Sequence, residues 1–388
     1  YYVICMRLSI SLVNSAVSRE CEPENEYLQV SDNGAWSLLR SLLASGPNLA
    51  EYTFRSACGF EPCPNSGRVS RWLAENRPAF APVVAADLND PQDTIAFDLS
   101  IGSLDLDAAT DIYDMETLGA KLFGKMRAAG ATAGIGRYNE TRLFYTTDIF
   151  RIGSNDEPHW RTVHIGVDIF MKPFSPVYVP LNGSVHSLRN NAGPLDYGPT
   201  IVLEHDTSDG LPFYTLYGHL SKESLEGLYR GKRVKKGERI ASIGPSSVNG
   251  GWPPHLHFQI ITDMLDKLGD FPGVAPPDSR EVWLSICPDP NLILNIAEEI
   301  FPTRDLAGED IVERRRKNIG PSLSIAYRKP LNIVRGYMQH LIDEDGQVYL
   351  DGVNNVSHVG HCHPKVVEAA RRQIGVLNTN TRYLHKTL

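Results

Sequence analysis

HIGVD at residues 164–168, YGHL at 217–220 and HLHF at 255–258 are the three phrases that decide how this chain is read. From Val163 to Ile169, apolar residues occupy every odd position, and His164 and Asp168 lie on even ones. Side chains alternate between the two faces of a strand, so we expect one apolar face and one face that carries both His164 and Asp168. His255 and His257 share a face in the same way.

These residue types are typical of a zinc site. Neutral imidazole and carboxylate groups are good zinc ligands, and three protein ligands leave a fourth position for a water whose pKa the metal lowers to about 7. Two further histidines could transfer a proton and stabilise charge on the reacting oxygen. Any one of these histidines alone is more often a hydrogen-bonded structural residue, but the three phrases in this order favour a metal site.

The pattern H-x-x-x-D, a lone His after Gly, and H-x-H resembles the lysostaphin-type (LytM-like) zinc metallopeptidases. The resemblance implies one zinc per chain, held by His164, Asp168 and His257. It implies that His255 is the general base and that His219 stabilises the oxyanion or shares the proton transfer. It covers roughly residues 150–295 and suggests glycine-rich or cell-wall crosslink peptides as substrates.

Composition limits the class of protein. With 388 residues the chain predicts two or three domains, and 42% hydrophobic and 22% charged residues are typical of a soluble globular protein. The net charge of -8 argues against a nucleic-acid partner. Six cysteines without a C-x-x-C motif indicate reduced thiols of a cytoplasmic protein. The chain does not begin with Met, which indicates a fragment of something longer.

Residues 148–295 are expected to form the zinc domain, with an antiparallel β architecture, because short β-type runs are separated there by Gly, Pro, Asn and Asp. We expect His186 to face solvent and His205 to be a hydrogen-bonded structural residue. Trp252, Pro253 and Pro254 are expected to stiffen one wall of the groove. The predicted strands are 162–169, 176–180, 183–189, 200–205, 213–219, 239–243 and 255–261, with a short helix at 221–228.

The N-terminal region is expected to be helical. Residues 1–17 are too short for the ~20-residue apolar run of a membrane span and are interrupted by Arg7, so we expect a buried helix. Helices at 35–44 and 47–57 follow. Residues 1–62 faintly resemble the tail of an aminoglycoside-phosphotransferase-like kinase lobe without its catalytic motifs, and a plain helical cap is the alternative.

Residues 63–147 are expected to be a mixed linker region, with a short helix at 71–76, a strand at 95–100 and a helix at 114–129. No helix pattern follows the Gly-x-Gly of residues 134–136, which argues against a nucleotide loop. Arg137, Glu140 and Arg142 have two interpretations. They could line the zinc groove and bind a substrate carboxylate, or form a surface ion-pair cluster, and the cluster is favoured.

Beyond a helical linker at 296–318, residues 319–388 change character. They contain a hairpin signal at Asp345-Gly346 and a helix signal at 365–374. Together with GHCHP at 360–364 and TNTRY at 379–383, these features resemble the N-terminal part of class III pyridoxal-phosphate aminotransferases. The resemblance implies that His361-Cys362-His363 is a turn and helix start rather than a second metal site.

The lysine that holds pyridoxal phosphate in that family lies in a part that this chain does not contain. The resemblance therefore implies that pyridoxal phosphate, transaminase activity and a homodimer through this part belong to a longer parent protein.

The sequence thus predicts a multidomain α+β fold, of bacterial origin, around an antiparallel β zinc-peptidase domain. The leading hypothesis is a zinc metalloendopeptidase acting on a peptide, with neither a nucleic-acid nor a membrane partner. Because the zinc domain is joined to a pyridoxal-phosphate enzyme and no export signal is visible, we expect the protein in the cytoplasm. Mature peptidoglycan is absent from that compartment, so a small amide or peptide metabolite is also possible as the substrate. The alternative is a non-catalytic zinc-binding or assembly module of a transaminase or phospho-lyase.

Overall fold

The computed structural model describes residues 1–25, 30, 32–103, 106, 114–152, 160–301, 308–320, 322, 323, 325, 327, 328, 330–352 and 358–377. The phrase at 379–383 lies outside these residues.

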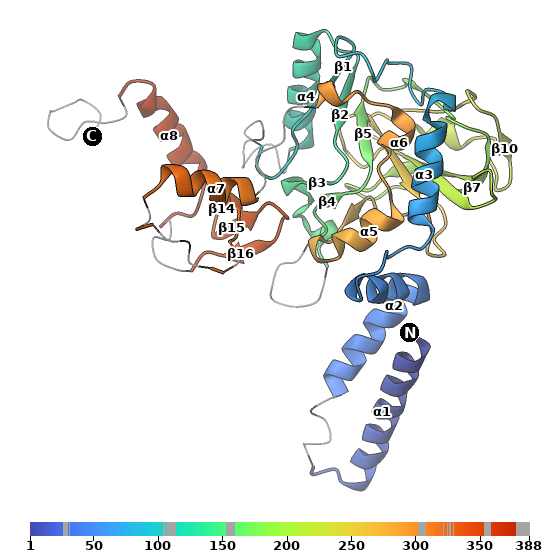
Figure 1. Cartoon of the computed structure of the whole chain (residues 1–388), viewed down its shortest axis with the longest axis vertical. Helices are drawn as coiled ribbons and strands as arrows, with labels where there is room; N and C mark the ends of the chain where they lie inside the picture. Colours follow the sequence, from blue (N-terminus) through green and yellow to red (C-terminus); the bar gives the residue numbers. More distant parts are fainter. Residues whose placement is uncertain are drawn as a thin grey trace.

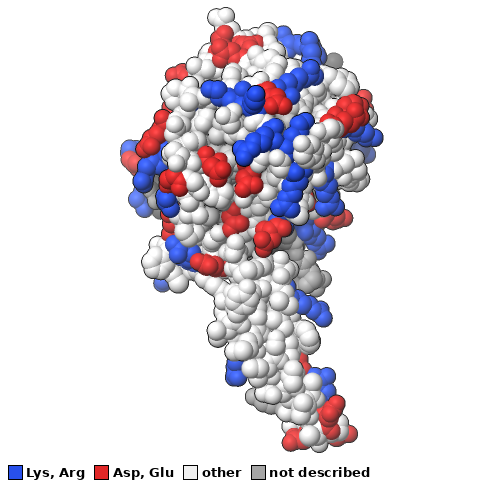
Figure 2. All heavy atoms as spheres, turned by 90° about the vertical axis from the view of Figure 1, so that its right-hand side faces the viewer, with Lys and Arg blue, Asp and Glu red and all other residues white. Residues whose placement is uncertain are grey.

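Two N-terminal helices, α1 (Tyr2–Cys21) and α2 (Asp32–Ala57), form a hairpin that projects from the rest of the chain (Figure 1). The expectation of a buried first helix is wrong: α1 packs against α2, and Leu12 is its one buried residue. Figure 2 shows this hairpin as a narrow stalk with few charged side chains on the face in view. No helix within the described residues has both the length and the apolar character needed to cross a membrane.

The helices predicted at 35–44 and 47–57 are confirmed as the two segments of α2. They are separated at Gly46, whose φ of 74° and ψ of 170° interrupt the helix, and Pro47 follows. Glycine tolerates this conformation because it has no Cβ, and proline is accommodated at the start of a helix, where no preceding carbonyl requires its missing N–H.

A large sheet organises the body of the molecule. Within the described residues it has eight strands, and all neighbouring pairs are antiparallel except β1 with β2. In spatial order the strands are β1 (Thr94–Ala96), β2 (Ala133–Gly136), β5 (Val167–Phe170), β12 (His255–Ile261), β9 (Pro212–Gly218), β8 (Gly198–Asp206), β7 (Gly183–Asn191) and β10 (Arg233–Val234). The predicted α+β fold with an antiparallel sheet is confirmed.

The predicted strand 162–169 is broken in two. Its first part, β4 (Val163–His164), pairs with β3 (Glu140–Thr141) and β13 (Val274–Ala275), whereas β5 lies in the large sheet. The break falls at Gly166, where an added Cβ would be 2.5 Å from the His257 ring. Both faces of the segment are buried, so the expected division into one apolar and one polar face does not hold.

Residues 63–147 are more ordered than the expected linker, because β1 and β2 extend the large sheet and β3 pairs with β4. The helix expected at 71–76 is longer, α3 (Ser66–Asn76), and the strand expected at 95–100 is shorter, β1. Helix α4 (Met115–Ala129) matches its prediction: Asp114 caps its start, and Gly130 ends it with a φ of 72°. The α4 residues Leu118, Leu122 and Met126 are buried.

The remaining elements complete the body and a C-terminal unit. The strand β6 (Pro176–Tyr178) pairs with β11 (Arg239–Ser242). The other helices are α5 (Arg280–Ile286), α6 (Asn291–Leu294), α7 (Gly308–Asn318) and α8 (Pro364–Ile374), and the short 3₁₀ turns are η2 (Arg77–Ala79), η3 (Leu143–Tyr145), η4 (Asp148–Phe150), η5 (Lys222–Leu225), η6 (Pro277–Ser279) and η7 (Glu298–Ile300). Ile296 and Ile300 belong to the main hydrophobic core, so the start of the expected linker packs with the zinc domain.

The C-terminal unit contains β14 (Ile333–Tyr337), β15 (His340–Asp343) and β16 (Val348–Leu350), beside α7 and α8 (Figure 1). The predicted hairpin at Asp345-Gly346 and the predicted helix after Pro364 are present. His361 Nε2 lies 2.7 Å from Asp351 Oδ2, which agrees with a structural role. All six cysteines are free thiols.

His205, at the end of β8, is buried as predicted and hydrogen-bonded on both ring nitrogens. Its Nδ1 lies 2.9 Å from the Asn182 carbonyl, and its Nε2 lies 2.8 Å from Thr215 Oγ1. Burial lowers the pKa of His205 to about 4. The ring is therefore neutral in the folded chain at pH values where it would be protonated in the unfolded chain.

This shift makes stability depend on pH. Between about pH 6.5 and pH 4 the unfolded chain binds a proton at His205 that the folded chain does not, so stability falls as pH is lowered through this window, by up to about 3 kcal/mol. In His205→Gln this contribution is absent. Urea unfolding of both proteins at pH 7 and pH 4.5 measures it. Equal losses of stability in the two proteins would contradict the assignment.

Candidate metal centre

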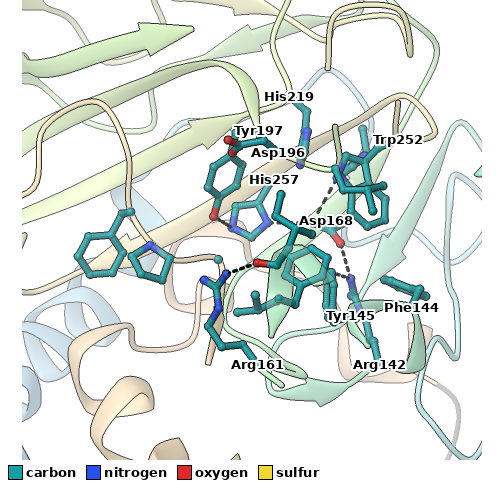
Figure 3. A pocket seen from close by; sticks show the side chains of 18 of the residues that line it. Arg142, Phe144, Tyr145, Arg161, Asp168, Asp196, Tyr197, His219, Trp252 and His257 are labelled. Atoms are coloured by element: carbon teal, nitrogen blue, oxygen red, sulfur yellow. Dashed lines mark hydrogen bonds and ion pairs between the residues drawn. The ribbon is translucent and has the colours of Figure 1, made fainter. Parts of the chain in front are cut away.

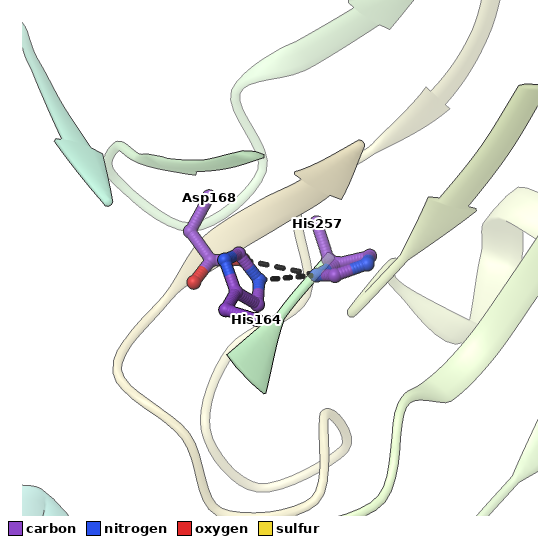
Figure 4. A group of neighbouring side chains, drawn as sticks. All are labelled: His164, Asp168 and His257. Atoms are coloured by element: carbon purple, nitrogen blue, oxygen red, sulfur yellow. Dashed lines mark hydrogen bonds and ion pairs between the residues drawn. The ribbon is translucent and has the colours of Figure 1, made fainter. Parts of the chain in front are cut away.

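Three side chains converge where β4, β5 and β12 meet (Figure 4). Register pairs His257 of β12 with Asp168 of β5, and His164 enters from β4. The His164 Nε2 and His257 Nδ1 atoms are 3.1 Å apart, and Asp168 Oδ1 lies 3.2 Å from the first and 3.0 Å from the second. In the part of the chain that the structure describes, this is the one cluster of His, Cys, Asp and Glu that could hold a metal ion. The three residues predicted as ligands are therefore brought together.

The protonation states fit a metal cation. Burial, with Arg142 nearby, lowers the pKa of His164 to about 4, so its imidazole is neutral near pH 7. Burial alone would raise the pKa of Asp168, but His164 and Arg142 outweigh it and hold that pKa well below its usual value. Two imidazole nitrogens and one carboxylate oxygen are a donor set that suits Zn²⁺.

Hydrogen bonds on the outer ring nitrogens orient both histidines. His164 Nδ1 donates to the Arg137 carbonyl at 2.8 Å, and His257 Nε2 donates to Gln259 Oε1 at 2.9 Å. A carbonyl oxygen only accepts, so the proton sits on the outer nitrogen and the inner nitrogen keeps its lone pair. These bonds leave the lone pairs of His164 Nε2 and His257 Nδ1 able to bind a metal ion.

Arg142 holds the other oxygen of Asp168. Its Nη1 donates to Asp168 Oδ2 at 2.6 Å and to the Tyr145 hydroxyl at 3.2 Å, and its Nε donates to Glu140 Oε2 at 2.8 Å. The side chain is only 1% exposed. The interpretation favoured from the sequence, a surface ion-pair cluster, is wrong for Arg142, because its ion pairs are buried. The other interpretation, binding of a substrate carboxylate, receives no support, because protein groups bond to all three of its guanidinium nitrogens. The pairing of β3 with β4 places Arg142 behind the ligands, where buried partners occupy its donors.

Asp168 carries the negative charge of this buried cluster. Its carboxylate and that of Glu140 both bond to the guanidinium of Arg142. Burial raises the pKa of Glu140, which favours its neutral form, whereas the pKa of Asp168 is held well below its usual value. A cation bound by His164, Asp168 and His257 would be stabilised by the Asp168 carboxylate, because a buried charge is stable only when compensated.

His255 and His219 lie side by side next to this cluster. Their ring centroids are 4.2 Å apart, and His255 Nε2 is 3.6 Å from Asp168 Oδ1. His255 Nδ1 donates to the Pro253 carbonyl at 2.7 Å, and His219 Nδ1 donates to the Asn249 carbonyl at 3.0 Å. The Nε2 atoms therefore carry the lone pairs in both neutral rings. His219 has a φ of 61°, a conformation that is uncommon outside glycine and is found at functional sites.

These side chains line a cavity of about 330 Å³ (Figure 3). Trp252 and Pro253 form part of its wall, as predicted. Further aromatic residues come from both sides of the site. They are Phe144, Tyr145, Phe150, Phe170, Tyr197 and Phe271.

Sequence reasoning missed three residues that touch the metal cluster. Tyr145 stacks on His164, with ring centroids 6.3 Å apart at 27°. The Tyr197 hydroxyl lies 3.4 Å from His257 Nε2, and Gln259 bonds the same nitrogen. Gln259 could have been found, because it lies two residues after His257 on the same face of β12. Tyr145 and Tyr197 have no local signal.

Comparison with known proteins identifies the family of this region. The family model of peptidase family M23 matches residues 162–267. An uncharacterized metalloprotease from Haemophilus influenzae is 38% identical over 96 residues, which are 25% of this chain and 18% of that protein. The catalytic domain of lysostaphin from Staphylococcus simulans is 27% identical and covers 34% of this chain and 85% of its own, with a TM-score of 0.22. The family match confirms the predicted metallopeptidase resemblance, whereas the limits 148–295 stay a prediction.

A second resemblance is also confirmed. A protein described as alanine--glyoxylate aminotransferase 2-like, from Drosophila melanogaster, is 45% identical over 90 residues, or 23% of this chain. The chain spans 18% of that relative's length, so the relative's activity as a whole is not carried over. The faint phosphotransferase resemblance of residues 1–62 receives no support and stays a prediction.

Arg142→Met tests the buried network. Removing the guanidinium leaves two buried carboxylates without their partner, so we expect a loss of about 3–5 kcal/mol in stability and about 10- to 100-fold weaker zinc binding. Urea unfolding and competition with a chelator measure the two effects. Arg142→Lys keeps the charge but loses the planar fork, so its stability and zinc affinity should lie between those of the unmodified protein and Arg142→Met.

Arg68→Met is the matched control, because the Arg68–Asp209 pair is more than half exposed on both sides and should contribute less than about 1 kcal/mol. Zinc affinity in Arg142→Met equal to that of the unmodified protein would show that the metal cluster does not depend on this network.

Proposed function

Because residues 162–267 form a peptidase family M23 domain, we propose that this chain is a zinc-dependent peptidase that hydrolyses amide bonds in the cavity beside His255 and His219. The observation that carries the proposal is the convergence of a complete donor set with two further neutral histidines in one cavity. His164 Nε2, Asp168 Oδ1 and His257 Nδ1 would hold the metal. Zinc bound there would polarise a carbonyl and lower the pKa of a water to about 7.

His255 is suited to the role of general base. Burial lowers its pKa, so its ring is neutral and can accept a proton. Its Nδ1 proton is held by the Pro253 carbonyl, which leaves Nε2 to accept a proton from the attacking water. Asp168, 3.6 Å away, stabilises the resulting imidazolium, which can then return the proton to the leaving amine.

For His219, the geometry supports one of the two roles inferred from the sequence. Burial and the neighbouring His255 lower its pKa well below the usual value, and the Asn249 carbonyl holds its Nδ1 proton. A neutral ring in this tautomer has no Nε2 proton to donate to an oxyanion. We therefore propose that His219 shares the proton transfer and donates to the oxyanion only after it has been protonated.

Tyr197 is a further candidate donor to the oxyanion. Tyr197 lines the cavity, and burial, with Asp270 nearby, raises its pKa well above the usual value, so its hydroxyl stays protonated. A protonated hydroxyl can donate to charge that develops on a substrate carbonyl.

Two inferences from the sequence stay proposals. We propose that the substrate is a glycine-rich or cell-wall-type peptide, or a small amide or peptide. We also propose that the chain acts in the cytoplasm, as part of a larger pyridoxal-phosphate transaminase or phospho-lyase that forms a homodimer. The alternative role of a non-catalytic zinc module is disfavoured. Binding of zinc by His164, Asp168 and His257 does not require His255 and His219, whose Nε2 lone pairs are suited to proton transfer.

His255→Ala should lower kcat/KM for peptide hydrolysis by at least about 100-fold, because the general base is removed, while one zinc per chain stays bound. The purified chain with zinc would be incubated with pooled peptides and peptidoglycan fragments, and cleavage would be detected by mass spectrometry.

His186→Ala is the control, because His186 is a half-buried histidine on β7 and does not line the cavity. Cleavage that persists in His255→Ala would exclude His255 as the base. A zinc-loaded chain that cleaves nothing in the pool would argue for the non-catalytic module.

A further inference from the structure

The cavity is lined in part by residues that lie outside the M23 match at 162–267. Leu118 of α4, Phe144 of η3, and Ile149 and Phe150 of η4 all line it. The five histidine and aspartate side chains of the site are each no more than 5% exposed. A volume of about 330 Å³ is at the lower end of the range for small-molecule sites, so it suits a short substrate better than the interior of a polymer.

Arg161 projects into this cavity from the segment just before β4 (Figure 3). Its Nη2 donates to the Ile149 carbonyl at 3.0 Å, and its guanidinium lies 5.8 Å from the centre of the Phe150 ring. Among the described residues no carboxylate lies within ion-pair distance of Arg161. The other N–H donors of this guanidinium are therefore available to a ligand.

Arg161 and Arg142 differ in how many protein groups bond to their guanidinium groups. Every side of the Arg142 guanidinium is occupied by protein groups, whereas Arg161 is half-buried at the wall of an open cavity with one backbone partner. Burial lowers the pKa of Arg161, while the charges of Asp270 and Asp196 act against that shift from a distance. A partly desolvated guanidinium without a paired anion is stabilised when a ligand supplies one.

Arg161 belongs to the same cavity as the candidate metal centre. The lining of this cavity includes Arg161 together with Asp168 and His257. Figure 3 draws these side chains around one pocket. A ligand that fills the cavity would therefore contact Arg161 at one wall and the candidate metal centre at another.

We infer that Arg161 binds an anionic group of the substrate, a carboxylate or a phosphate, and that the site hydrolyses small amides that carry such a group near the scissile bond. The inference rests on the proposed peptidase function and deepens it by naming the substrate class. Binding of a substrate carboxylate by the planar fork of an arginine was one interpretation of Arg137 and Arg142 from the sequence, and here it is assigned to Arg161. The aromatic wall formed by Phe144, Phe150 and Trp252 would receive an apolar part of the same substrate.

Kinetics with paired substrates test the inference. N-acetyl-dipeptides would be supplied as free acids and as C-terminal carboxamides, with a third set in which a phosphomonoester replaces the carboxylate. We expect the unmodified zinc-loaded chain to prefer one of the anionic sets by roughly 10- to 100-fold in kcat/KM, the size of a charge-assisted contact. The preferred set distinguishes carboxylate from phosphate.

In Arg161→Met the preference should disappear, because the anionic substrates fall to the rate of the carboxamides while the carboxamide rate stays within about 3-fold. Arg161→Lys should recover part of the preference. Arg230→Met removes the same charge from an exposed loop residue outside the cavity and should behave as the unmodified protein. An equal fall for acids and carboxamides, or a preference that survives in Arg161→Met, would overturn the inference.

A binding measurement separates this inference from the peptidase proposal. Phenylacetate, phenyl phosphate and phenylacetamide cannot be cleaved as peptides. Calorimetry would measure the affinity of each compound for the zinc-loaded unmodified chain and for zinc-loaded Arg161→Met. The comparison combines a change in the ligand, anion to amide, with a change in the protein. Any contact of the anion with zinc occurs in both proteins and cancels. A loss of at least 10-fold in anion affinity, with phenylacetamide unchanged, would support the anion site even if no substrate were cleaved. No difference between the two proteins would refute the site even if peptides were hydrolysed.

Discussion

The buried carboxylate of Asp168 is the group on which the site depends. One of its oxygens faces the nitrogens of His164 and His257, and the other accepts from Arg142. A carboxylate that is 4% exposed is stable only when its charge is compensated, so the strands that bring these partners must all be in place. Glu140 bonds to the same guanidinium and so helps to fix Arg142 beside Asp168. The Asp168 charge that Arg142 compensates in the fold is therefore the same charge that favours a bound cation.

Backbone carbonyls set the chemistry of the histidines. The carbonyls of Arg137, Pro253 and Asn249 each accept from a ring Nδ1, so His164, His255 and His219 present Nε2 lone pairs inward. The side chains of the three residues that supply these carbonyl oxygens have no part in this effect, which depends on the path of the backbone. The left-handed conformation of His219 and the strand break at Gly166 are two places where that path departs from a regular sheet to bring a ring into position.

The cavity is assembled from more of the chain than the M23 region. Elements between residues 115 and 150 supply one wall, and the C-terminal unit packs behind that wall. Ile342 of β15 belongs to the same hydrophobic cluster as Phe144 and Trp252, and Arg335 of β14 donates to the carbonyls of Ile101 and Ser103. The aminotransferase-like part is thus in physical contact with the support of the peptidase cavity, which gives the two resemblances a structural connection.

Much of the site could be predicted from the sequence. Strand periodicity and short spacing are local properties, so they single out the candidate ligands His164, Asp168 and His257 and the neighbouring His255 and His219. The structure brings all five together. The β-strands of the zinc domain, the helix ending at Gly130 and the turn at Asp345-Gly346 are likewise encoded by neighbouring residues.

The tertiary structure decided the rest. A charged residue such as Arg142 or Arg161 carries no local mark of its partners, because those partners come from strands and turns distant in the chain. The pairing of β3 with β4 buries Arg142 behind the candidate metal ligands, and the packing of η4 beside the cavity places Arg161 in the cavity wall. Local alternation determines which residues can share a face, whereas long-range pairing and burial determine what each charge meets.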